Sequence, residues 1–202
     1  RSRGLGDVYK RQVKEVNDQF KTQVNAKYAF YRTHYVNNDD KLIEVDNLYK
    51  QREVYVSTAN MYTIFPFWDV SMSYDFQWNE MKADMYGFVF PTRFTNLLSI
   101  ATALRLGKVK LQGSGLATFV NDRVKEGPAP KARQILTPAV FLSYKLFDKH
   151  DFSLRAFYKK TFRMPTFNDL YYADMGNSKL DPEYVTQYNL GLSLIHISEP
   201  TR

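Results

Sequence analysis

The 202-residue sequence contains no cysteine, and it has only 9 glycines and 8 prolines. The lack of cysteine excludes a disulfide scaffold, a thiolate metal site and a cysteine nucleophile. The sequence also lacks any run near the roughly 18 consecutive apolar residues that a membrane-spanning helix needs. What it has instead is 15 tyrosines and 15 phenylalanines. This aromatic content favours β-strands.

The two ends of the chain are related to each other at the level of DNA. One back-translation of residues 192–202, LSLIHISEPTR, has a reverse complement that reads SRGLGDVYKRQ, which is the sequence of residues 2–12. Unrelated segments do not share this relation, and both resemble translated sequencing adapter on the two sides of a DNA insert. We therefore expect residues 1–12 and 192–202 to be adapter-derived, and residues 13–191 to be the genuine segment.

Removing these ends changes what the charge of the chain implies. The net charge falls from +7 to +4, so the basic character is partly a property of the ends. A nucleic-acid partner is not expected from so small an excess. His196 lies in an adapter-derived end, which leaves His34 and His150 as the histidines of the genuine segment.

A strict period-two pattern runs from Trp68 to Asn79, where apolar residues alternate with polar ones. The pattern predicts a strand with one apolar and one polar face. Similar or weaker patterns predict eight strands in total and no convincing helix. The predicted strands are Phe20–Tyr35, Val54–Ile64, Trp68–Asn79, Leu98–Leu106, Lys108–Asn121, Ala139–Leu146, Phe152–Lys159 and Tyr184–Gly191.

The connections between these strands alternate between long and short. The long ones are Asn37–Arg52, Lys82–Pro91, Asn121–Arg133 and Arg163–Glu183, and the short ones are Phe65–Phe67, Gly107–Lys108 and Asp148–Asp151. An antiparallel meander with all its long loops at one end is typical of outer-membrane barrels. The fold class predicted is all-β: a partial transmembrane β-barrel, with about eight strands of a larger barrel.

A soluble β-barrel or sandwich would show the same alternation, because its apolar face would meet a core instead of lipid. Lys and Arg occupy the polar faces of the predicted strands, as Arg105 and Arg155 do. On a lipid face each would cost roughly 2–4 kcal/mol at the midplane. Aromatic residues crowd one short turn at Phe65, Phe67 and Trp68, as in an interfacial girdle. The soluble alternative predicts that the apolar stripes share one interior, and the membrane alternative predicts a continuous outer belt.

The segment from Phe162 reads FRMPTFNDLYYADMGNSKLDPEYVTQYNLG. It resembles the late barrel region of TonB-dependent outer-membrane receptors, in which Arg-x-Pro, Asn-Asp-Leu and Gly-Asn-x-x-Leu-x-Pro-Glu follow one another. Asp181 departs from the Lys that is usual there, and Gln187 from a frequent Glu, which bears on subfamily and ligand. The matching residues, which we expect to be structural, are Arg163, Pro165, Asn168, Asp169, Leu170, Gly176, Asn177, Leu180, Pro182 and Glu183.

The resemblance implies a protein of the bacterial outer membrane, in contact with its lipid, that takes up a large scarce nutrient. Iron–siderophore chelates, cobalamin and glycans are the ligand classes of such receptors, and no cofactor is implied. The barrel would be blocked by a plug domain that the TonB complex pulls. Neither the plug nor the TonB-contacting box occurs in this sequence. The segment alone is therefore expected to transport nothing.

Ligand contacts are expected in the long loops, where aromatic side chains suit large, partly apolar ligands. The candidates are Tyr171, Tyr172, Asp174, Tyr86 and Phe88, and packing of loop on loop is the alternative role of these residues. An outer-membrane barrel enzyme would be another class of function. It needs a Ser/His/Asp or Asp/His constellation, and His34 beside Asp39 and Asp40 is more typical of a solvated loop. No catalytic site and no metal site is predicted.

Overall fold

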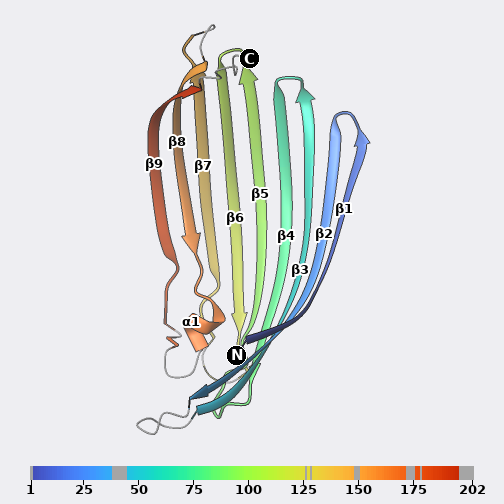
Figure 1. The fold of residues 1–202 in the computed structure, drawn as a ribbon, viewed down its shortest axis with the longest axis vertical. Helices are drawn as coiled ribbons and strands as arrows, with labels where there is room; N and C mark the ends of the chain where they lie inside the picture. The colour runs from blue at the N-terminus through green and yellow to red at the C-terminus, as the bar shows by residue number, and fades with distance from the viewer. Residues whose placement is uncertain are drawn as a thin grey trace, which may run out of the picture.

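The computed structural model describes residues 2–37, 45–125, 127, 129–147, 151–171, 176–177 and 179–195. These residues form one sheet of nine antiparallel strands in the order of the chain, together with one short helix (Figure 1). None of the described helical residues belongs to a helix long and apolar enough to cross a membrane. The elements are β1 (Ser2–Asn17), β2 (Phe20–Asn37), β3 (Val45–Phe65), β4 (Trp68–Ala83), β5 (Thr92–Leu106), β6 (Val109–Arg123), β7 (Arg133–Lys145), β8 (Asp151–Arg163), α1 (Phe167–Tyr171) and β9 (Glu183–Ile195).

The antiparallel meander predicted from the sequence is confirmed, and its strands are longer than predicted. The predicted loop Asn37–Arg52 is wrong in its second half, because β3 already pairs with β2 from Val45 onward. This part of β3 mixes apolar and polar residues on both faces, with Tyr49 on one and Leu48 on the other, so alternation did not reveal it. The prediction of no helix is also wrong, since α1 forms inside the connection from β8 to β9. A ninth strand, β1, pairs along β2.

The two ends of the sheet differ. All connections at the lower end of Figure 1 are the long ones, and the tight turns lie at the upper end. The turn between β5 and β6 consists of Gly107 and Lys108 alone, with Gly107 at a φ of 56°. Glycine adopts this left-handed conformation without steric cost. We call the lower end the long-loop end and the upper end the short-turn end.

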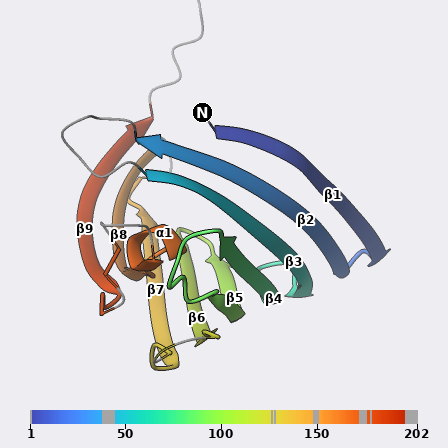
Figure 2. The ribbon, with the colours of Figure 1, turned by 90° about the horizontal axis from the view of Figure 1, so that it is seen from below.

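The sheet is strongly curved, and α1 lies inside the arc (Figure 2). Cross-strand partners point to the same face, so Met72, Ile100 and Gly115 share the convex face. The middle of this convex face forms an apolar belt: Met72 is 50% exposed, Ile100 55% and Leu136 64%. The apolar stripes thus form one outer belt and share no interior. The soluble alternative is wrong for this fold.

The height of the belt suits a bilayer. On β4 the belt begins at Trp68 and ends at Trp78. Ten residues at about 3.3 Å each, tilted by about 40°, span about 25 Å, the height of the apolar band of outer-membrane barrels. At the short-turn end Phe65 stacks on Phe67, with ring centroids 5.4 Å apart, and lies 6.4 Å from the ring of Trp68. Aromatic residues therefore mark the border of the belt, as interfacial girdles do.

The concave face is the polar one, and it is the face on which side chains are buried. Ser57, Asn79 and Thr118 lie on it, each less than 9% exposed. The sheet does not close, because β1 and β9 are its two edges. An open edge is not tolerated in hydrocarbon. The sheet is therefore the wall of a partial barrel whose concave face lines the lumen.

Candidate ligand site at the long-loop end

A buried arginine fixes the β8–β9 connection to the wall of the lumen. Arg93 of β5 donates two hydrogen bonds of 2.7 Å to the carboxylate of Asp122, its direct partner on β6. Its remaining terminal nitrogen, Nη1, donates to the carbonyl oxygen of Pro165 at 2.6 Å. The guanidinium also lies over the ring of Phe167, 5.2 Å from the centroid. We call these four residues the loop anchor.

The loop anchor is well shielded from water. The side chains of Arg93 and Asp122 are 10% and 4% exposed. A buried, bidentate pair of this kind is sensitive to loss of one partner, which leaves an uncompensated charge at a cost of about 3–5 kcal/mol. The third bond, to the Pro165 carbonyl, links this pair to the loop. The β8–β9 connection is therefore held on the wall from its first residues.

Helix α1 starts with a reciprocal cap. The backbone N–H of Thr166 donates to Oδ2 of Asp169 at 2.8 Å, and the N–H of Asp169 donates to the Thr166 hydroxyl at 3.2 Å. The backbone hydrogen bond from Thr166, followed by its hydroxyl contact, lowers the pKa of Asp169 below its usual value of 3.8. The N–H of Asn177 donates to the Asp169 carbonyl at 2.9 Å. The cap fixes the first residue of the short helix, and the bond from Asn177 ties the chain that follows the helix back to it.

Apolar side chains, most of them aromatic, from two loops and two strands pack together over this end of the lumen. Phe88 is 2% exposed, and its ring meets Tyr49 of β3 edge-on at 6.3 Å and Phe90 at 5.4 Å. Met81 of β4 and Phe167 of α1 belong to the same buried cluster. The β4–β5 connection and the β8–β9 connection are thus joined through one apolar cluster.

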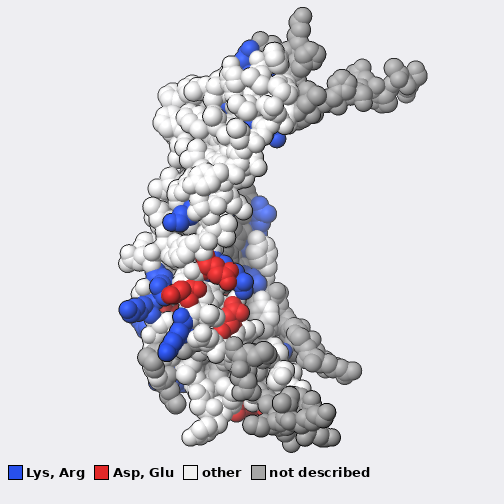
Figure 3. All heavy atoms as spheres, turned by 90° about the vertical axis from the view of Figure 1, so that its left-hand side faces the viewer, with Lys and Arg blue, Asp and Glu red and all other residues white. Residues whose placement is uncertain are grey.

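The third long connection is tied to the other two. The N–H of Lys125 donates to the Val89 carbonyl at 3.0 Å, and the Lys125 ammonium lies 5.4 Å from the Phe90 ring. Arg133 at the start of β7 pairs with Asp181 of the β8–β9 connection. We call the described parts of these three connections, residues 84–91, 124–132 and 164–182, the loop roof. Seen from the β9 side, charged side chains gather toward this end of the molecule (Figure 3).

A cavity of about 390 Å³ lies between the loop roof and the wall. Its size is in the range of ligand pockets. Uncharged hydrogen-bonding side chains dominate the wall side of the cavity, and the loop roof contributes apolar side chains. The charged groups of the lining are paired, Arg93 with Asp122 and Glu53 with Lys27. The lining residues are Gln51, Glu53, Gln77, Asn79, Arg93, Thr95, Leu97, Thr118, Val120, Phe162, Met164, Thr166 and Phe167.

Thr118 is the one wall residue of this cavity whose buried polar atom has no partner in the described part of the chain. The residue is 2% exposed, and its hydroxyl makes no hydrogen bond to a described residue. A buried hydroxyl without a partner costs roughly 1–3 kcal/mol. The wall of the cavity therefore holds an unused hydrogen-bonding group.

The sequence-predicted contact residues occupy different positions. Phe88 is buried in the loop roof, whereas Tyr86 is fully exposed at the tip of its loop. Tyr171 is half-buried against the apolar cluster, and its hydroxyl has no described partner. Burial, and then the charge of Asp122, raise the pKa of Tyr171 above its usual value of 10.0. Tyr172 and Asp174 lie outside the described residues.

The residues of the family-like motif lie along the β8–β9 connection. Arg163 pairs with Asp169 at 3.5 Å and with Glu183 at 4.0 Å. Leu170 and Pro182 are buried, and Asn168 and Gly176 are exposed. The Leu180 N–H donates to the Asn177 carbonyl at 3.2 Å. These contacts are within the connection or with β8 and β9, whereas the Pro165 carbonyl accepts a hydrogen bond from Arg93 of β5.

Arg93, Asp122 and Thr118 were missed from the sequence. A signal for the first two was present, because the predicted turn Gly107–Lys108 fixes the register of its hairpin. Counting outward by equal steps from that turn pairs Arg93 with Asp122. Opposite charges at directly opposed positions indicate a cross-strand ion pair. Burial of the pair depends on the loop that covers it, which the count does not show.

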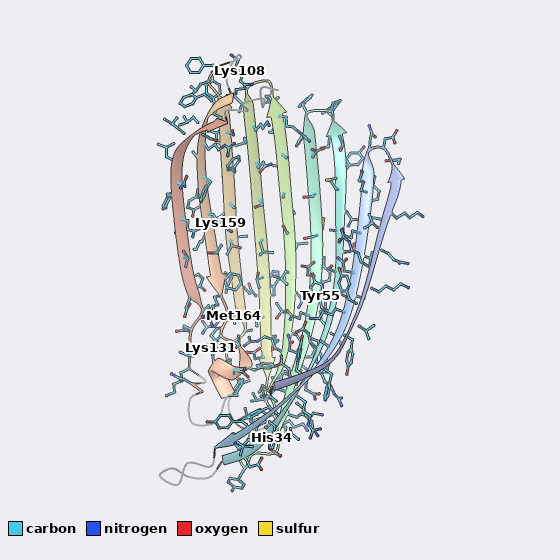
Figure 4. All side chains as sticks on the ribbon, in the orientation of Figure 1. His34, Tyr55, Lys108, Lys131, Lys159 and Met164 are labelled. Atoms are coloured by element: carbon cyan, nitrogen blue, oxygen red, sulfur yellow. The ribbon has the colours of Figure 1, made fainter. Side chains whose placement is uncertain are left out.

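Other chemistry-bearing groups are dispersed. No group of three His, Asp or Glu residues that could hold a metal ion occurs in the described ranges. His34, near the long-loop end in Figure 4, contacts Asp46 across β2 and β3. Asp39 and Asp40, which the sequence placed near it, and His150 lie outside the described residues.

Comparison with known proteins identifies relatives of this fold. Residues 4–197 match the family described as "TonB dependent receptor-like, beta-barrel". Among solved structures, the copper transporter OprC superimposes with a TM-score of 0.72 at 16% identity, over 92% of this chain and 35% of that one. BauA, the ferric preacinetobactin receptor of Acinetobacter baumannii, gives 0.59 at 15% identity, over 92% of this chain and 34% of that one.

A third structure, FpvA of P. aeruginosa bound to heterologous pyoverdines, gives a TM-score of 0.61 at 17% identity, over 95% of this chain and 30% of that one. At these identities the structures show the fold alone. The chain spans about a third of the length of each. No curated protein matches the sequence.

Proposed function

Because the chain belongs to the TonB-dependent receptor-like β-barrel family, a family of the bacterial outer membrane, we propose that its parent protein is a receptor for active uptake. The nutrient is large and scarce, of the class of siderophore-bound iron, cobalamin or a glycan. The observation that carries the proposal is the long-loop end, where a folded loop roof covers a cavity of about 390 Å³ on the lumen side. A receptor mouth needs such a preformed, concave site.

Within that mouth, the exposed ring of Tyr86 is placed to meet a ligand directly. Tyr172 and Asp174 are proposed to do so from the β8–β9 connection. Phe88 and Tyr171 belong to the loop roof, so their part is to shape the site. Aromatic rings suit this role because they bury large areas against partly apolar ligands.

The motif residues are proposed to hold the β8–β9 connection in place. Pro165 supplies the carbonyl that Arg93 binds, and Asp169 caps α1. Arg163, the last residue of β8, pairs with Asp169 of α1 and with Glu183, the first residue of β9. This role explains why a defined series of residues is needed in a connection that is otherwise long.

Transport requires further parts. We propose that a plug domain closes the lumen and is pulled by the TonB complex, while the convex belt contacts lipid. Enzymatic activity is not proposed. OprC is a transporter and BauA a receptor by description, and the described His34 pairs with Asp46 on the strands, away from the cavity lining.

Residues 1–12 and 192–202 are proposed to be translated adapter. On the convex face of β1, Lys10 and Gln12 stand beside Ala26 and Val24 of the belt. Backbone pairing accepts any such sequence, but a lysine in the belt is unfavourable in lipid. Sequencing outward from the insert in the source DNA tests this. Genomic codons for other residues in place of 1–12 and 192–202 would support the proposal. Genomic codons for these same residues, continuous with the insert, would contradict it.

Uptake is tested with the complete gene recovered from the source DNA. The receptor is expressed in a host that lacks receptors for the nutrient offered, and cell-associated labelled iron–siderophore, cobalamin or oligosaccharide is measured. The proposal predicts accumulation of one class that is lost in an isogenic host without TonB. Accumulation that is equal in both hosts, or of no class, contradicts it.

A further inference from the structure

A second hollow lies on the opposite face of the sheet, beyond the border of the belt at the long-loop end. Its volume is about 320 Å³, and strands β2, β3 and β4 form it. Basic side chains dominate its lining, with one acidic and one aromatic residue. The lining residues are Phe30, Arg32, Lys50, Arg52, Glu80 and Lys82.

The strand register places these side chains in two rows. Trp78, the last aromatic residue of the belt on β4, is level with Val54. Two residues farther out along the strands, Arg52 lies opposite Glu80, and four residues farther out Lys50 lies opposite Lys82. In the strand register, Arg32 of β2 lies directly opposite Lys50 of β3. The basic rows thus follow the belt within about 7–13 Å along the strands, at the rise of about 3.3 Å per residue.

The charges of this hollow are not balanced. Its lining carries a net charge of +3, and its one acid, Glu80, pairs with Lys82 at 3.2 Å. Within the described ranges, Arg32, Lys50 and Arg52 have no acidic partner. All three are exposed.

The nearest acids farther out on this face are engaged elsewhere. Asp46 contacts His34, and Asp84 accepts a hydrogen bond from the N–H of Leu48 at 2.7 Å. Three like charges side by side repel one another unless an anion lies between them. The hollow therefore has the charge and the donors for an anionic group that the described residues do not supply.

We propose that this hollow binds the phosphate-bearing headgroup of a lipid in the outer leaflet. Two features favour a lipid over free phosphate. The hollow is continuous with the apolar belt, so acyl chains can lie along Tyr28 and Val54 while the headgroup reaches the basic rows. The long loops of such barrels are extracellular, which places these rows at the outer surface of the membrane.

Arginine suits this contact because its planar donor fork matches phosphate oxygens, and each basic residue near a membrane surface adds to the attraction for anionic lipid. Phe30 adds an apolar wall beside the charges. The bound lipid would stabilise strands β2 to β4 against one another at their outer ends. This inference depends on the membrane placement of the family and not on which nutrient is taken up.

The test is native mass spectrometry of the complete receptor in detergent, with added diphosphorylated lipid A and its dephosphorylated form. The account predicts that the phosphorylated lipid binds at least tenfold more tightly. In the triple variant Arg32→Gln, Lys50→Gln, Arg52→Gln its affinity falls roughly 100-fold, about fivefold per charge removed. The control variant Lys110→Gln, Arg155→Gln, Lys159→Gln removes the same charge from the concave face and leaves the affinity unchanged.

Equal affinity for the two lipids in the unmodified receptor would overturn the proposal, and this arm does not depend on any variant folding. Unchanged binding by the folded triple variant would overturn it too. A third arm adds inorganic phosphate: complete displacement of the lipid at low millimolar concentration would show a site for free phosphate. Nutrient uptake is not read in any arm, so failure here leaves the proposed uptake untouched.

Discussion

A soluble protein buries its apolar side chains and exposes its polar ones, and the two faces of these strands do the opposite. On the concave face Thr118 is 2% exposed and Asn79 8%, whereas on the convex face Leu136 is 64% exposed. At the long-loop end the polar face is covered by loops and carries the buried loop anchor. The apolar side chains of the convex face are exposed to the surroundings of the protein. A sheet that buries threonine and exposes leucine is stable only where the surroundings are apolar, so the difference supports the proposal that one face meets lipid and the other lines the lumen.

The largest effect is expected from breaking the loop anchor on the concave face. Arg93→Met leaves the carboxylate of Asp122 buried and frees the Pro165 carbonyl. The free energy of unfolding of the complete receptor in vesicles should fall by about 3–5 kcal/mol. Denaturant unfolding measures this change, and hydrogen exchange should show faster exchange across 164–171.

A matched control uses another arginine–aspartate pair on this face, one that lies outside the loop roof. Arg105 pairs with Asp69 near the short-turn end, where the arginine side chain is 49% exposed. Arg105→Met should cost at most about 1 kcal/mol, as for exposed ion pairs. Equal losses for the two variants would show that burial by the loop roof contributes nothing.

The next effect separates the two faces directly. Met72→Lys places a charge at the middle of the belt and should lower the unfolding free energy in vesicles by about 2–4 kcal/mol. Ser73→Lys places the same charge on the adjacent, concave position. It should change the unfolding free energy by less than half as much. A larger loss for Ser73→Lys than for Met72→Lys would reverse the assignment of the faces.

A smaller effect is expected at the cap of α1. Thr166→Ala removes the hydroxyl that accepts from the Asp169 N–H. The cost should be about 0.5–2 kcal/mol, confined to the loop roof. Hydrogen exchange of residues 167–171 measures it, and Thr166→Ser should retain slow exchange. Exchange as slow in Thr166→Ala as in the unmodified receptor would argue against the cap.

The smallest effect is a dependence on pH. The pKa of Asp169 is lowered in the folded loop, chiefly by the backbone hydrogen bond from Thr166. Its contribution to stability is therefore present above the unfolded value of 3.8 and is lost as pH falls through the lower folded value. Asp169→Asn should remove this part of the pH dependence between about pH 2 and 5. Identical pH profiles of unfolding for the variant and the unmodified receptor would contradict this.

Alternation predicted most of the fold, because one apolar and one polar face impose period two on strands such as Trp68–Asn79. It failed where that constraint ends. Residues 45–52 of β3 extend beyond the belt, where each face mixes polar and apolar residues and the pattern disappears. Helix α1 is five residues long, too short for a periodic signal, and depends on Arg93 and the roof for its place.

The candidate site was harder to predict for the same reason. Phe88 and Tyr171 were selected because they are aromatic residues in long loops, and the structure gives them neighbours in the roof that no local pattern contains. The register of a tight turn could have revealed the pairing of Arg93 with Asp122. The burial of Thr118 could not have been found, since it depends on contacts between segments distant in sequence.

The most direct test of the account is the environment of alternate side chains on β4. The chain has no cysteine, so single cysteines at positions 72, 73, 74 and 75 of the complete receptor can be spin-labelled selectively once any cysteine elsewhere is replaced. In phospholipid vesicles, labels at 72 and 74 should collide with dissolved oxygen more than with a water-soluble nickel chelate, and labels at 73 and 75 should not. If labels at 73 and 75 collided more with oxygen than with the nickel chelate, or if the ratio did not alternate along the strand, the assignment of the convex face to lipid would be contradicted.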